Sequence, residues 1–149
     1  MQKRHLRTVG GGGPSRLFVD SGGWIALVSA GDAHHAAADQ MFRAAVARRI
    51  PLLTTNLIIA EVHRLVLFRA GIRAAASVLD RINGSQSVNI EFATAAHHRT
   101  ARTWMERLGD QVITYTDAVS FAVMQAAPCA AVIGFDHDFL IAGFQFWQP

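Results

Sequence analysis

The chain has 149 residues, of which 51% are hydrophobic and 17% are charged, so its length and composition predict one globular domain with a sizeable buried core. Its formal net charge is +3, from 14 lysines and arginines against 11 acidic residues, which is compatible with a polyanionic partner without requiring one. No apolar run approaches the length of a membrane span, and the N-terminus lacks the apolar centre of a signal peptide. We therefore expect no membrane partner. The single cysteine, Cys129, excludes an internal disulfide and fits a protein of the reducing cytoplasm.

The first 15 residues, MQKRHLRTVGGGGPS, are basic and then rich in glycine. Glycine-rich stretches behave as flexible coil. We therefore predict a flexible basic, glycine-rich tail over residues 1–15, followed by a single folded domain over residues 16–149.

Short apolar strands alternate with helices in the first part of the chain. RLFVD at 16–20 is typical of a buried strand that ends in a carboxylate, and Ser-Gly-Gly at 21–23 is predicted to turn the chain into a helix from Trp24. The elements expected next are a helix over 32–49, a strand over 51–54, a helix capped by Thr55 or Asn56 and ended by Gly71, a helix over 73–82 and a strand over 88–90.

The last part of the chain continues the alternation, beginning with a helix expected over 94–108. The stretch YTDAVSFAVMQAAPCAAVIGFDHDF then predicts a helix that is N-capped by Thr116 and stopped by Pro128. It continues into an apolar strand over 130–133, typical of a strand buried on both faces of a parallel sheet. A last strand is expected over 143–147. Together these elements predict an α/β fold, a three-layer α/β/α sandwich around a central, mostly parallel sheet.

Three aspartates lie where side chains from different elements can meet. Asp20 and Asp136 each follow a predicted buried strand, and Asp117 lies in the first turn of a predicted helix. Because sites in open α/β sheets form beyond the carboxyl ends of the strands, we expect Asp20 and Asp136 to share one edge of the sheet. Taken singly, Asp20 can be a helix cap, and Asp117 can be a charge that complements the helix dipole.

Glu61 is the most informative acidic residue, because it lies within the apolar stripe of its helix. It is three or four residues from members of that stripe, so it is predicted to point toward the core. The stripe consists of Leu57, Ile58, Val62, Leu65 and Phe68. A carboxylate on an apolar face must be paired, bound to a metal or neutralised. A buried ion pair between Glu61 and Arg64 is therefore one alternative.

A metal ion is the other explanation for the acidic residues, considered jointly. Clustered carboxylates repel, and each raises the pKa of the others. A divalent cation removes that conflict, and ligands that are all oxygen suit Mg²⁺ or Mn²⁺. Such an ion activates water and stabilises charge on phosphoryl oxygens, so the set favours phosphodiester hydrolysis. We expect Asp20 and Asp136 to bind the metal directly, and Glu61 and Asp117 to bind it directly or through water.

Four segments in order, FVDSGGWIAL, TTNLIIAEVHRL, YTDAVSFAVM and VIGFDHDF, resemble the motifs of a PIN domain. Among PIN domains they look most like the VapC-type toxins of bacterial type II toxin–antitoxin systems. The resemblance runs from about Arg16 to the C-terminus. It implies a Mg²⁺- or Mn²⁺-dependent endoribonuclease that cuts single-stranded RNA. The catalytic acids of the family carry over to Asp20, Glu61, Asp117 and Asp136.

The resemblance extends to supporting residues and to partners. Ser21 matches the hydroxyl residue that often follows the first acid, and Ser120 matches the serine one turn after the third acid. Asp138 is a further carboxylate that can share the role of Asp136. The family also implies a homodimer, silenced by a small VapB-like antitoxin whose C-terminal segment lies over the active site.

Two other hypotheses remain open at this point. Gly22 and Gly134 replace hydroxyl or amide residues that many relatives carry, so the chain can be a degenerate PIN fold that binds RNA or a protein without cutting. Phe18-Val19-Asp20-Ser21 also superficially suits a phosphotransfer fold with an aspartyl nucleophile. That fold expects a second acid two residues later, where this chain has Gly22, so we rank it last.

Overall fold

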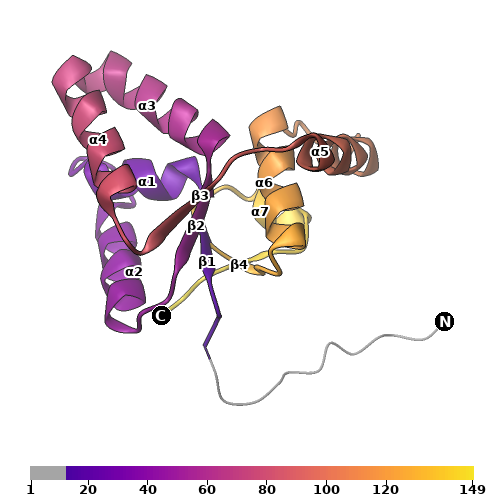
Figure 1. The fold of residues 1–149 in the computed structure, drawn as a ribbon, viewed down its shortest axis with the longest axis horizontal. Helices are drawn as coiled ribbons and strands as arrows, with labels where there is room; N and C mark the ends of the chain where they lie inside the picture. The colour runs from indigo at the N-terminus through magenta and orange to yellow at the C-terminus, as the bar shows by residue number, and fades with distance from the viewer. Residues whose placement is uncertain (1–12) are drawn as a thin grey trace.

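The computed structural model describes residues 13–149, so the predicted tail lies, except for its last three residues, outside the described residues (Figure 1). The strands are β1 (Leu17–Val19), β2 (Leu52–Thr55), β3 (Val88–Glu91), β4 (Ala131–Ile133) and β5 (Gln145–Phe146). The helices are α1 (Ser21–Val28), α2 (His35–Ala47), α3 (Asn56–Ala70), α4 (Ile72–Gly84), α5 (Ala95–Arg107), α6 (Tyr115–Ala126) and α7 (Asp138–Ile141). No helix in this part of the chain is both long and apolar enough to cross a membrane.

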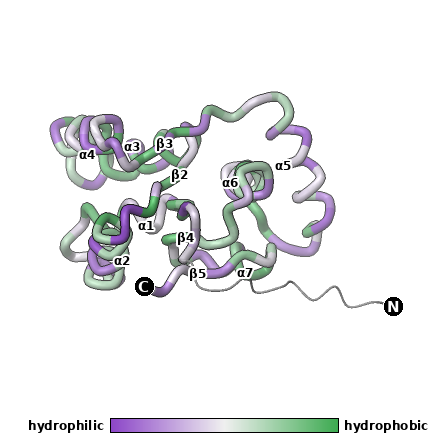
Figure 2. Tube along the Cα trace, turned by 60° about the horizontal axis from the view of Figure 1, so that its bottom comes forward, coloured by the Kyte–Doolittle hydropathy of each residue, from purple (hydrophilic) through white to green (hydrophobic). Residues whose placement is uncertain are grey.

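The five strands form one sheet in the order β3-β2-β1-β4-β5, and every neighbouring pair is parallel. Helices α1 to α4 lie on one side of the sheet and α5 to α7 on the other (Figure 1), and the same two groups flank the strands in Figure 2. The three residues of β1, at the centre, are fully buried, as expected of a strand covered on both faces. The predicted three-layer α/β/α sandwich is therefore confirmed.

Helix α6 lies deepest among the helices, with every residue from Asp117 to Met124 buried. Its apolar side chains contact helices α5 and α7 on the same side of the sheet. The Phe121 ring lies edge-on to Phe139 at a centroid distance of 5.2 Å and to Trp104 at 5.5 Å. The first turn of α6 is consequently held firmly at the carboxyl edge of the sheet, which fixes where Asp117 lies.

The start of α1 differs from the prediction, because residues 21–23 form the first helical turn rather than a loop before Trp24. Helix α1 begins directly after Asp20, where the chain leaves β1. A Cβ atom on Gly23 would lie only 2.5 Å from the carbonyl oxygen of Ile133, so a residue without a side chain is required there. The glycine therefore permits close approach of a helix and a strand.

Two helix caps test the predicted starts. Thr55 caps α3, as one of the two predicted alternatives, by accepting a hydrogen bond from the Ile58 N–H at 3.1 Å. The predicted cap Thr116 is wrong: Thr114 caps α6 and accepts from the Asp117 N–H at 3.1 Å. A capping hydroxyl serves the N–H two or three residues ahead, and Asp117 is three residues from Thr114.

The predicted stripe of α3 is wrong at one end, because Phe68 is 78% exposed. The buried positions are Ile58, Val62 and Val66, which recur every four residues. The short helix α7 was not predicted. Helix α2 begins three residues later than expected, and α4 extends through Gly84 instead of ending at residue 82.

Candidate metal centre

The carboxyl ends of β1 and β4 meet at one edge of the sheet. Val19 pairs with Ile133, and the Asp20 N–H donates to the Ile133 carbonyl at 3.1 Å. Asp20 is the residue after β1, and Asp136 is the third residue after β4. The strand pairing therefore brings these two acids, from opposite ends of the chain, to the same edge, as the parallel topology predicts.

Three carboxylates form a tight cluster there. One carboxylate oxygen from each of Asp117, Asp136 and Asp138 lies within 4.8 Å of the other two. Asp117 comes from the first turn of α6, Asp136 from the turn between β4 and α7, and Asp138 is the first residue of α7. The Asp138 N–H donates to Asp136 Oδ1 at 2.9 Å, which fixes that turn. Asp138, which the sequence suggested only as an additional carboxylate, is thus a member of the cluster.

Asp20 lies beside this cluster and is almost completely buried, with 3% of its surface exposed. Burial raises the pKa of Asp20 from 3.8 to about 7; the Ser21 backbone N–H opposes this change, and the charges of Asp117 and Asp136 add to it. Its Oδ1 atom has no hydrogen-bond partner among the described residues. A buried oxygen without a partner is costly, so Asp20 is the residue that most needs a ligand.

Asp117 experiences a similar conflict. Burial raises its pKa from 3.8 to about 6, the Thr114 hydroxyl lowers it, and the charges of Asp136 and Glu61 raise it further. Burial and the Asp136 charge also raise the pKa of Asp138, while His137 lowers it. Each of these acids is therefore easier to protonate than an isolated aspartate, because the site concentrates negative charge in a partly dry space.

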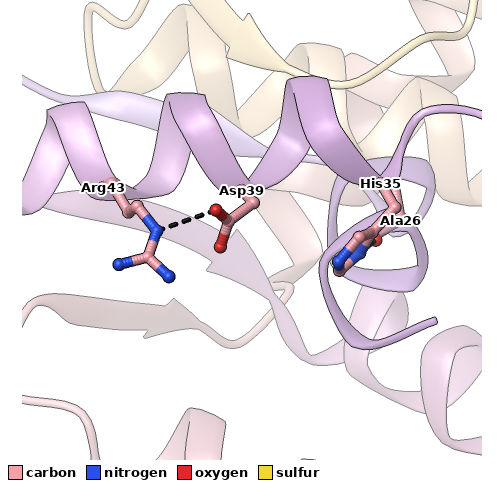
Figure 3. Close-up of polar contacts among 4 residues, drawn as sticks. All are labelled: Ala26, His35, Asp39 and Arg43. Atoms are coloured by element: carbon pink, nitrogen blue, oxygen red, sulfur yellow. Dashed lines mark hydrogen bonds and ion pairs between the residues drawn. The ribbon is translucent and has the colours of Figure 1, made fainter. Parts of the chain in front are cut away.

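Glu61 is half-buried on α3 and lies outside the tight cluster. Its charge nevertheless raises the pKa values of both Asp20 and Asp117, which places it on the same site. The alternative ion pair with Arg64 is wrong, because the Arg64 guanidinium lies over the Phe68 ring at 5.6 Å. Within residues 13–149 the only ion pair joins Arg43 and Asp39, on the exposed side of α2 (Figure 3).

The two serines differ in what their hydroxyls can do. Ser21 is the first residue of α1 and is half-buried beside Asp20. Ser120 is fully buried, and its Oγ donates to the Thr116 carbonyl at 2.9 Å, so its proton is used within α6. Ser120 therefore steadies the helix that carries Asp117.

Gly134 borders Asp20 from the β4 side. A Cβ atom on Gly134 would lie 3.1 Å from the Cβ of Asp20 and 3.7 Å from its Oδ2. The glycine thus leaves space against the buried carboxylate where a larger residue would crowd it. It also supplies no hydroxyl to Asp20, which is consistent with the lack of a partner for Oδ1.

The donor set fits a hard divalent cation. The site offers carboxylate oxygens only, one of them buried without a partner, and no cation from the described residues pairs with them within 4.0 Å. Mg²⁺ and Mn²⁺ prefer such ligands and would offset the mutual repulsion of the acids. The geometry therefore has the composition of a metal centre at the carboxyl edge of a parallel sheet.

Comparison with known proteins agrees with this fold and site. The PIN domain family matches residues 17–145, which is most of the chain. The chain therefore belongs to the PIN domain family.

The relatives narrow the comparison to VapC-type toxins, confirming the resemblance in the sequence. The chain is 36% identical over 134 residues to the 23S rRNA-specific endonuclease VapC20 of Mycobacterium tuberculosis, strains CDC 1551 / Oshkosh and ATCC 25618 / H37Rv. That match covers 89% of this chain and 98% of VapC20. The crystal structure of VapC20, described as a sarcin-ricin loop cleaving toxin, superposes with a TM-score of 0.80 at 35% identity, over 89% of this chain and 99% of that one.

Sequence reasoning missed Thr114 at this site. Its hydroxyl both caps α6 and lowers the pKa of Asp117. The signal was present, because Thr114 lies three residues before Asp117, the spacing between an N-cap and the N–H it serves. Asp138 was harder to place, since only the turn between β4 and α7 shows that it faces Asp117.

Proposed function

We propose that the protein is a metal-dependent endoribonuclease that hydrolyses RNA phosphodiester bonds as the toxin of a toxin–antitoxin pair. The observation that carries the proposal is the buried Asp20 oxygen beside the three-carboxylate cluster, which has no hydrogen-bond partner in the described part of the chain. An acidic site of this kind can hold a divalent cation against a phosphate. The similarity to VapC20, named as a 23S rRNA-specific endonuclease, supports RNA as the substrate class.

Mg²⁺ or Mn²⁺ is the proposed cofactor, held by Asp20, Asp117 and Asp136. When bound, such an ion supplies Lewis-acid activation of water and neutralises charge on the phosphate. Asp138 orients Asp136, since its backbone N–H donates to the Asp136 carboxylate. Ser21 contributes through its N–H, which lowers the pKa of Asp20 and so favours the ionised form that a metal needs.

Glu61 has a separate proposed role. It is half-buried, it lies on the opposite helical layer from Asp117, and it is not in the tight cluster. A carboxylate at that position can accept a proton from water or reach the metal through a water molecule. We therefore assign Glu61 to water positioning, with Asp20, Asp117 and Asp136 as the metal-binding acids.

The proposed partners are an RNA substrate, a VapB-like antitoxin and a second copy of the chain, in the cytoplasm. Large exposed apolar side chains support contact with other proteins: Phe68 and Ile72 are each 78% exposed where α3 meets α4. Single exposed apolar residues are ordinary, but two neighbours at one helix junction favour an interface. The buried single cysteine, Cys129, fits a reducing compartment.

The test is cleavage of 23S rRNA and of short single-stranded RNA by purified, antitoxin-free protein with Mn²⁺, with Mg²⁺ and with chelator. We expect cutting only with metal, and a rate at least about 100-fold lower for Asp117→Asn, because a lost ligand removes several kcal/mol of charge stabilisation. Asp110→Asn, an exposed aspartate outside the site, is the matched control. Metal-independent cutting, or none, would refute the proposal.

A non-catalytic RNA- or protein-binding module is the second candidate, and Gly134 is the observation that favours it. Residue 134 has no hydroxyl to offer the Asp20 carboxylate, so the site lacks a group that many relatives carry and that can help to position the metal or its water. Metal binding and RNA binding without any cleavage, unchanged by Asp20→Asn, would establish this candidate instead.

A further inference from the structure

Two aromatic rings stack at the rim of the acidic site. The imidazole of His34 lies parallel to the ring of Phe135, with a centroid distance of 4.1 Å and an interplanar angle of 9°. Phe135 is the residue between Gly134, which borders Asp20, and Asp136 of the carboxylate cluster. The stack therefore connects the turn between α1 and α2 directly to the segment that carries the site.

The backbone on the His34 side is held by several hydrogen bonds. The His34 N–H donates to Asp32 Oδ1 at 2.8 Å, and the His34 carbonyl accepts from the Ala38 N–H at 2.9 Å. The next residue is also anchored, because His35 Nδ1 lies 2.7 Å from the Ala26 carbonyl oxygen (Figure 3). The ring of His34 is consequently presented from a fixed turn, so that a ligand need not order it.

The two members of the stack differ in exposure. Phe135 is half-buried, and a Cβ atom placed on Gly22, at the start of α1, would lie 4.0 Å from Cδ2 of its ring. His34 is exposed. Phe135 covers one face of the imidazole, and the residue is otherwise exposed to solvent. An aromatic ligand can therefore extend the stack outward from the protein.

We propose that His34 is the base-stacking residue of this site: a nucleobase next to the scissile phosphate stacks on its ring, giving a continuous base–His34–Phe135 stack. This inference rests on the proposed nuclease function and deepens it by naming how the substrate is positioned. Single-stranded RNA is typically recognised by unstacked bases on aromatic or histidine rings. Such stacking tolerates any base, and purines offer the larger surface, so the site favours a purine at that position.

The geometry also explains how stacking serves the reaction. Consecutive Cα atoms are about 3.8 Å apart, so the Phe135 ring and the Asp136 carboxylate are carried by adjacent points of one short segment. A base fixed on that segment fixes the phosphate beside it relative to the acids. His34 therefore positions the substrate by direct contact with the base, and Phe135 supports the other face of its ring.

The test uses single-turnover cleavage of a short RNA and of the same RNA with an abasic nucleotide at each position around the cut. For the wild type, one abasic position should slow cleavage roughly tenfold, within the range for stacked bases. His34→Ala should slow cleavage of the intact RNA by a similar factor. The variant should then cut the RNA that is abasic at that position as fast as it cuts the intact RNA. His34→Phe, which keeps a stacking ring, should restore the rate to within about threefold of wild type.

The design separates stacking from support of the fold. Gln111→Ala, which removes an exposed side chain from the segment between α5 and α6, is the control and should cut like wild type. Thermal denaturation checks each variant, and sensitivity to the abasic position is a ratio within one protein, so reduced stability cannot produce it. An Ala variant that cuts all the RNAs at wild-type rates, or keeps wild-type sensitivity to every abasic position, overturns the inference and leaves the proposed function intact.

A different readout applies if wild-type protein cuts no RNA, which would sink the proposed function itself. Single-stranded RNA carrying 2-aminopurine is then titrated with metal-free protein, because stacking quenches its fluorescence. Quenching by wild type that His34→Ala abolishes and His34→Phe restores supports the stacking platform on a non-catalytic domain. Equal quenching, or none, by wild type and His34→Ala refutes it.

Discussion

Asp20 and Asp138 belong to the same acidic site but lie in opposite surroundings. Asp20 follows the central strand, is 3% exposed, and has a carboxylate oxygen without a hydrogen-bond partner in residues 13–149. Asp138 begins the short surface helix α7, is half-buried, and its backbone N–H supports Asp136. The comparison teaches that one acidic site contains both a buried acid that needs a ligand and an acid that can remain solvated.

The largest expected effect is the difference in activity between these two positions. Asp20→Asn should reduce RNA cleavage at least about 100-fold, because it removes the proposed buried metal ligand. Asp138→Asn should reduce it about tenfold or less, in the range for residues that orient a ligand. Initial rates at saturating Mn²⁺ measure both. Equal losses would show that burial does not separate the two roles.

The next effect is on metal-linked stability. Mn²⁺ at 100 times its dissociation constant should raise the free energy of unfolding by about 2.7 kcal/mol. For a chain of this length that corresponds to an increase in Tm of roughly 5–10 °C. Asp20→Asn should remove most of this increase, and Asp138→Asn should retain most of it. Differential scanning calorimetry with and without chelator tests this, and NaCl at matched ionic strength controls for general ionic effects.

A third effect concerns pH in the metal-free protein. Asp20 and Asp117 have folded pKa values of about 7 and about 6, both above the ordinary 3.8, so the folded state binds protons that the unfolded chain has released. The contribution of these two groups to the free energy of unfolding is therefore complete below about pH 4, and it is lost as pH rises toward 7.

Denaturant unfolding from pH 4 to pH 8 measures this loss. Asp20→Asn should flatten the profile, because an amide does not titrate, and saturating Mn²⁺ should flatten it in the wild type, because the cation replaces the protons. A metal-free protein whose stability instead rises through this range would contradict the burial of Asp20.

The smallest expected effect is at Gly134. Gly134→Ser places a hydroxyl near Asp20, and a donor to the ionised carboxylate should lower its pKa and weaken the pH dependence. The added Cβ meets the Asp20 Cβ at 3.1 Å, a tight contact, so we expect activity within about threefold of wild type and a stability change of about 1 kcal/mol or less. Gly134→Ala adds the same carbon without the hydroxyl. Identical pH profiles for the two variants would rule out the hydroxyl effect.

Much of the fold followed from sequence because its signals are local. Apolar runs separated by glycine and proline marked the strands, and their alternation with helices indicated a parallel sheet. The predicted starts and ends of helices were wrong where a contact with a residue distant in sequence decides the local conformation. Residues 21–23 read as a turn because glycine usually breaks helices, yet the proximity of Ile133 to Gly23 makes glycine the residue that lets α1 begin there.

The candidate site followed from sequence in part. Asp20 and Asp136 were placed by the strands before them, and Asp117 by its helix start. Asp138 belongs to the carboxylate cluster because of the conformation of the turn before it, and the periodicity of apolar residues does not predict that conformation. The stacking of His34 on Phe135 depends on tertiary structure alone, since adjacent histidines at a helix start gave no indication of which ring faces the site.

The pairing of β1 with β4 has a consequence for synthesis of the protein. Asp20 emerges from the ribosome before Asp117, Asp136 and Asp138. The central strand β1 therefore lacks one of its two neighbours until β4 has been made. A nascent or truncated chain that lacks β4 and the residues after it has no carboxylate cluster, so the proposed nuclease would remain inactive until that segment has been translated.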